Sequence, residues 1–175
     1  MKRGRSAVIV IAAVALAGCG AQARHRPPVC VRGTSALLAS RLAIPQSAVS
    51  QAVSTGNNGM PQCVLSARRP GAQPVRVTAN LDNGAQPYFR LERTAVEASQ
   101  QFGTVRLYAA PQQIPGLGLD ADWFPDGDYL ETTDGVRLIT VTIGWRGSSQ
   151  AQRRGLAQAM ARPFLERPRA KRATG

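Results

Sequence analysis

Histidine is almost absent from this sequence, and that scarcity restricts the catalytic chemistry open to it. The only histidine among 175 residues is His25, in a polar stretch that ends at a Pro-Pro pair. A Ser-His-Asp or Cys-His site needs a base held within hydrogen-bond reach of the nucleophile, and a linker cannot hold one. Glycine-rich phosphate loops of the P-loop or dinucleotide-binding kind are missing too. We therefore expect that the protein is not an enzyme and carries no cofactor.

Acidic residues are also few, ten in all, and half of them lie within the stretch IPGLGLDADWFPDGDYLE. A calcium loop needs oxygen ligands at alternate positions, glycine at the sharp turn and a closing glutamate. Phe124 occupies a ligand position here and Pro125 the turn, so the pattern fails and no metal site is expected. The stretch predicts a solvated acidic loop. Carboxylates between Asp120 and Glu131 leave a carboxylate-based hydrolase open as an alternative.

The N-terminus has the architecture of a secretory signal peptide over residues 1–18. Basic residues precede an apolar run of twelve residues, which is shorter than the roughly 20 residues of a membrane-spanning helix. The run ends in Leu16, Ala17, Gly18 and Cys19, which resembles the lipobox of bacterial lipoproteins. The resemblance implies that the Cys19 thiol is acylated and becomes the first residue of the mature chain. An ordinary signal peptide cut near Ala23 is the alternative.

Lipidation at Cys19 would make residues 19–28 a tether and place the protein at the extracytoplasmic face of the cell membrane. The membrane, through this lipid, is then the first expected partner, and palmitate an expected modification. Cys30 and Cys63 remain as a pair. An exported chain meets an oxidising compartment, so we expect a disulfide between them. Two reduced thiols binding metal would lack further ligands nearby.

The formal net charge is +12, and the excess lies at the two ends of the chain. Residues 30–150 are nearly balanced, so a basic face of the kind that binds nucleic acid is not expected. The ends suit contact with anionic lipid head groups or acidic wall polymers. The alternative, which we favour for residues 168–175, is a solvated, disordered basic tail.

The first half of the chain predicts short helices followed by a hairpin. The segment TSALLASRL predicts a helix with Thr34 as its N-cap. A second short helical stretch is expected after Pro45, because Val49 and Val53 are four residues apart. Alternation of apolar and polar residues over 62–84 predicts a β-hairpin that contains Cys63 in its first strand.

The second half predicts a helix, three strands and a closing helix. Apolar residues at helical spacing mark a helix over 87–102, and a strand is expected over 104–109. An Asp-Gly pair at 134–135 marks a hairpin whose second strand is apolar on both faces, as in a central strand. Ser149 and Gln152 form a capping box before the last helix. The fold class is therefore α+β: an antiparallel sheet with helices packed on one face, in a single disulfide-stapled domain over 29–167.

The turn PGLGLDADW and the hairpin and Ala/Leu-rich helix after it resemble small cell-envelope lipoproteins of actinobacteria with a domain of unknown function. The resemblance implies a PsbP-type fold, similar to the outer sensor domains of mycobacterial receptor kinases, and supplies no catalytic residues. Gly116 and Gly118 are expected to serve a turn with unusual backbone angles.

Four aromatic residues near this turn are candidates for a ligand pocket, although aromatics beside a loop more often cover a core. They are Trp123, Phe124, Tyr129 and Trp145. Together these features predict a non-catalytic, membrane-anchored envelope lipoprotein that binds a small apolar ligand, a glycan or a partner protein. A purely structural envelope component is a further alternative.

Overall fold

The computed structural model describes residues 30–56, 61–68, 70–83, 94 and 109–166. The signal peptide, Cys19, the tether, the basic tail and the predicted helix over 87–102, apart from the helical residue Thr94, lie outside these residues. The predicted strand over 104–109 does so as well, except for Ala109.

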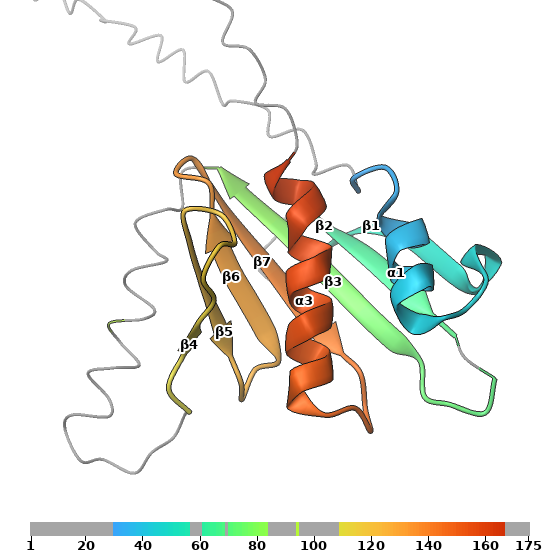
Figure 1. Ribbon diagram of the computed structural model, residues 1–175. Helices are drawn as coiled ribbons and strands as arrows, with labels where there is room; N and C mark the ends of the chain where they lie inside the picture. Colours follow the sequence, from blue (N-terminus) through green and yellow to red (C-terminus); the bar gives the residue numbers. More distant parts are fainter. Residues whose placement is uncertain (1–29, 57–60, 69, 84–93, 95–108, 167–175) are drawn as a thin grey trace, which may run out of the picture.

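Within the described residues, seven strands form one antiparallel sheet in the order β1-β2-β3-β7-β6-β5-β4, with α1 and α3 on one face (Figure 1). This arrangement confirms the predicted α+β class. The strands are β1 (Val49–Thr55), β2 (Pro61–Ala67), β3 (Val75–Asn83), β4 (Gln112–Gln113), β5 (Asp120–Phe124), β6 (Tyr129–Thr133) and β7 (Arg137–Gly144). The helices are α1 (Thr34–Leu42), the 3-10 turn η1 (Gln46–Ala48) and α3 (Gln150–Leu165).

The core lies between the sheet and the two helices. In β3 the side chains of Val75, Val77 and Ala79 are at most 1% exposed and alternate with more exposed neighbours. α3 contributes Met160 and Phe164, both fully buried. β7 is the middle strand of the seven, which confirms the prediction made from its two apolar faces. Alternation in the strands and helical spacing in α3 thus place the apolar side chains in one layer.

The predicted disulfide is present. It joins Cys30 to Cys63 with 5.0 Å between the two Cα atoms. Cys63 lies in β2, which pairs with β3 as the predicted hairpin, and Val53 of β1 lies opposite it. The bridge therefore fastens the start of the domain to the second strand of the sheet.

Two predictions for the first helices are wrong. The N-cap of α1 is Gly33, with φ 88°, and Thr34 is buried inside the helix with its hydroxyl donating to the Val31 carbonyl at 2.8 Å. The second helical stretch is only the three-residue η1, after which Val49 and Val53 belong to β1. A spacing of four residues repeats on one face of a strand as well as on one face of a helix, so it did not separate the two.

Local signals at the other end of the domain are confirmed. Asp134 accepts hydrogen bonds from the backbone N–H groups of Val136 and Arg137 and from the Arg137 guanidinium, across the tight turn between β6 and β7. Burial alone would raise the pKa of Asp134, but these bonds outweigh it and hold the pKa below its ordinary value. At the start of α3, Ser149 and Gln152 form the predicted capping box.

Candidate functional site

The acidic stretch is a hairpin, and the prediction of a solvated loop is wrong for its two strands, although Asp126 in the turn between them is exposed. β5 and β6 pair antiparallel, with Asp122 directly opposite Glu131. Both carboxylate side chains are buried, Asp122 at 1% exposure and Glu131 at 5%. Ala121 and Trp123 alternate with the acidic residues and join the core beneath the helices. The strand period of two therefore separates this segment into an apolar face and a polar face.

The four aromatic candidates do not meet in one pocket. Trp123 is fully buried in the core, whereas its neighbour Phe124 is on the opposite face of the sheet and stacks on Tyr129. The two ring centroids are 4.6 Å apart, with 9° between the ring planes. Trp145 is half-buried and packs against the core after β7 ends. Residues adjacent along a strand point to opposite sides, so Trp123 and Phe124 cannot line the same wall.

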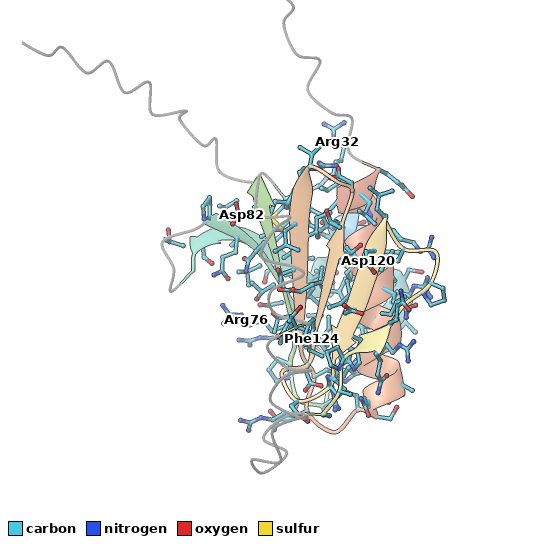
Figure 2. The ribbon with its side chains drawn as sticks, turned by 90° about the vertical axis from the view of Figure 1, so that its left-hand side faces the viewer. Arg32, Arg76, Asp82, Asp120 and Phe124 are labelled. Atoms are coloured by element: carbon cyan, nitrogen blue, oxygen red, sulfur yellow. A yellow bond between two sulfur atoms is a disulfide. The ribbon has the colours of Figure 1, made fainter. Side chains whose placement is uncertain are left out.

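A row of polar side chains crosses the sheet on the face away from the helices. Pairing of neighbouring strands puts its members opposite one another from β5 to β1: Asp122, Glu131, Thr140, Asn80, Gln62 and Ser54. The Thr140 hydroxyl donates to Glu131 Oε1 at 3.4 Å. Figure 2 labels the two ends of β5, Asp120 and Phe124, and shows Arg76 of β3 on the side away from α3. The row itself is polar from β5 to β1, whereas Phe124 and Tyr129 lie on the same face at the end of β5 and β6.

Carboxylates in this row could serve a hydrolase only if substrate reached them. At 1% and 5% exposure, Asp122 and Glu131 lie below the molecular surface. Among the described residues there is no group of three or more His, Cys, Asp or Glu side chains that could hold a metal ion. In the same part of the chain, no helix combines the length and apolarity needed to cross a bilayer.

A hollow of about 380 Å³ opens between the edge strand β4 and the first half of α3. Three side-chain amides and one guanidinium contribute to its lining, together with aliphatic side-chain carbons and helix backbone: Gln112, Gln150, Ala151, Arg154, Gly155 and Gln158. The five helical residues share one face of α3 because their spacing follows its turns. Arg154 donates to Gln112 Oε1 at 3.0 Å and so links the two walls. The volume falls within the range of small-molecule sites.

Gly155 keeps the helical wall of this hollow open. Glycine inside a helix costs about 1 kcal/mol relative to alanine. Here it is exposed, and a Cβ placed on it would meet no atom within 4 Å. Close packing in the described fold therefore does not require glycine at this position. A larger side chain at position 155 would extend into the hollow, which Gly155 lines.

Sequence patterns alone did not indicate this hollow. Gln112 and Arg154 are 42 residues apart in the chain, and only the packing of α3 beside β4 brings them together. The glutamines of α3 have the composition of any exposed helical face. No family model, curated protein or solved structure matches the chain.

Proposed function

We propose that this protein is a lipid-anchored lipoprotein of the cell envelope whose extracytoplasmic domain is non-catalytic and binds a glycan. The observation that carries the location is the Cys30–Cys63 disulfide, since such bonds form and persist in oxidising compartments. It pairs the two cysteines that remain once Cys19, in its lipobox-like setting, is assigned to the lipid. The order of turn, hairpin and helix over 115–165 supports kinship with the small actinobacterial lipoproteins.

The amide and guanidinium groups at the hollow beside α3 suit a ligand with hydroxyl and acidic groups. Side-chain amides donate and accept hydrogen bonds at once, which matches the hydroxyl groups of a sugar. The Arg154 guanidinium adds a charged donor suited to a carboxylate. The aromatic side chains that would favour an apolar ligand are divided between two faces of the sheet. We therefore assign a glycan that carries an acidic group to this hollow.

The burial of Asp122 and Glu131 supports a binding role over hydrolysis. A general acid must reach the leaving oxygen of its substrate, and a nucleophile or base must reach the anomeric carbon or a water beside it. At 1% and 5% exposure, Asp122 and Glu131 offer a substrate no such access.

Lipidation is tested by metabolic labelling with radioactive palmitate in the native host. We expect label on the wild-type chain and its recovery in the membrane fraction, because two or three acyl chains anchor stably. Cys19→Ala removes both, whereas the matched change Cys30→Ala leaves the label in place. Absence of label on the wild-type chain, or label that persists in Cys19→Ala, contradicts the anchor.

Glycan binding is tested with the mature lipoprotein in detergent, using oligogalacturonate as the acidic probe and galactan oligomers as the neutral one. We expect tighter binding of the acidic probe. Gly155→Leu fills the hollow with a good helix former, so binding falls at least tenfold while the fold is retained. Arg154→Gln removes the preference between the two probes.

The control for added bulk is Ala36→Leu on the exposed side of α1, which leaves binding unchanged. Failure of the wild-type protein to bind either probe, or wild-type affinity in Gly155→Leu, overturns the assignment of this hollow. That result would not contradict the lipid anchor, because the anchor is tested by palmitate labelling and not by ligand binding.

A further inference from the structure

The two edges of the sheet differ in a way that points to a partner. An open edge strand presents unpaired backbone donors and acceptors, and proteins limit this with short strands, charges, prolines or bulges. β4 is such a limited edge, only two residues long. β1, at the other end of the sheet, has seven residues and the sequence VSQAVST, with no charge and no proline. Figure 1 shows β1 and β4 at opposite ends of the sheet.

β1 is also unusually exposed for a strand of this length. Five of its seven residues are exposed and the other two are only partly buried. Val53 has 51% of its surface accessible, one of three large apolar side chains exposed to this degree in the described part of the chain. Among the described residues, β2 is the only strand that pairs with β1. The outer edge thus lacks the usual devices against pairing and carries an apolar side chain that pairing would cover.

We propose that β1 pairs antiparallel with β1 of a second copy of this chain, joining two sheets into one. A two-fold axis at Ala52 makes the strand complementary to itself. It sets Gln51 opposite Val53 of the partner subunit and Ser50 opposite Ser54 of the partner subunit. No like charges face each other, and the exposed Val53 of each copy lies beside the aliphatic part of the Gln51 side chain of the partner subunit. The contact is isologous, so it closes at two copies and does not propagate.

Crosslinking tests the register. In the paired state Ala52 lies opposite its own copy, and directly opposed Cα atoms in antiparallel strands are about 4.5–5.5 Å apart. That span suits a disulfide. Ala52→Cys therefore gives a covalent dimer on a non-reducing gel under mild oxidation. Ser54→Cys, on the same face of the same strand, does not, because its counterpart is displaced by four residues along the strand.

Light scattering of the detergent-solubilised mature chain tests the assembly itself. We expect a dimer for the wild type and a monomer for Val53→Lys, in which a charge joins the exposed edge. Ser40→Lys on the exposed side of α1 stays dimeric. Thermal unfolding checks that both lysine variants are folded.

Three results overturn the proposal: a wild-type monomer at micromolar concentration, equal crosslinking of Ser54→Cys and Ala52→Cys, or a dimer that survives Val53→Lys. A wild-type monomer that recruits a strand of another protein would show that the edge serves a different partner. None of these outcomes bears on the lipid anchor or the glycan site, which are measured separately.

Discussion

Replacing both Cys30 and Cys63 by alanine lowers the free energy of unfolding by about 3 to 4 kcal/mol. The bridge closes a sequence separation of 33 residues, so its loss restores many conformations to the unfolded chain. α1 in the segment it fastens also packs against β1, β2, η1 and α3, with Leu38 and Leu42 in the core, so the bridge adds to these contacts. Cys63 is fully buried in β2, so its replacement also removes packed sulfur from the core.

Urea unfolding of the oxidised wild type, the reduced wild type and the double variant separates these two contributions. Reduction removes the crosslink but keeps both sulfur atoms, so the reduced protein should lie between the other two. Each midpoint is read at equal protein concentration, since dimer formation would add to apparent stability. If the free energy of unfolding of the double variant falls by less than about 1 kcal/mol, the disulfide contributes little to stability.

The parts of the fold that could be predicted from the sequence are those determined by a few adjacent residues or by the number of cysteines. The disulfide was predicted from an odd number of cysteines and a lipobox-like sequence that ends at Cys19. The Asp-Gly pair before β7 and the capping box of α3 each depend on a few adjacent residues, and both are confirmed. The central position of β7 followed from apolar residues on both of its faces. Such patterns involve only a few neighbouring residues, so they can be interpreted without knowing how the rest of the chain folds.

The parts that failed depend on tertiary context. Val49 and Val53 satisfy the helical and the strand period equally, and only the partner strand β2 decides between them. The stretch around Asp122 looked solvated because carboxylates rarely lie buried. In the structure the sheet places alternate residues on opposite faces, so the acidic side chains enter a polar row across six strands. The hollow beside α3 is formed by residues distant in sequence, and its glutamines gave no pattern to detect.

The turn before β5 shows a case where sequence and structure agree on backbone conformation. Gly116 and Gly118 were expected to adopt unusual angles, and their φ values are 73° and 67°. Gly118 has a second constraint that sequence could not reveal. A Cβ placed there would lie 2.5 Å from Thr132 Oγ1 and 2.5 Å from the Thr133 carbonyl oxygen.

These two oxygen atoms cannot easily move away. The buried Thr132 hydroxyl bonds to the Leu117 carbonyl at 3.1 Å and to the Asp120 carbonyl at 3.0 Å. The Thr133 carbonyl accepts the Leu119 N–H at 2.7 Å. The same contacts that hold the turn against β6 therefore leave no space for a side chain at position 118.

Gly118→Ala should consequently destabilise the protein by roughly 2 to 5 kcal/mol. About 1–2 kcal/mol comes from a Cβ in the left-handed region, and a further 1–3 kcal/mol from forcing an atom into a filled space. Gly116→Ala is the matched control, because its φ is similar but no atom lies within 4 Å of its Cβ. It should cost only the first part.

The difference between the two variants in urea unfolding isolates the steric contact from the backbone strain. Equal losses for Gly116→Ala and Gly118→Ala would mean that the turn separates from β6 at little cost, and Thr132 would then not hold it. A larger loss at 118 would show that the β5–β6 hairpin is fastened at this end by the two threonines. The contact of the Gly118 turn with Thr132 and Thr133 would then also help to position the polar row, which begins at Asp122.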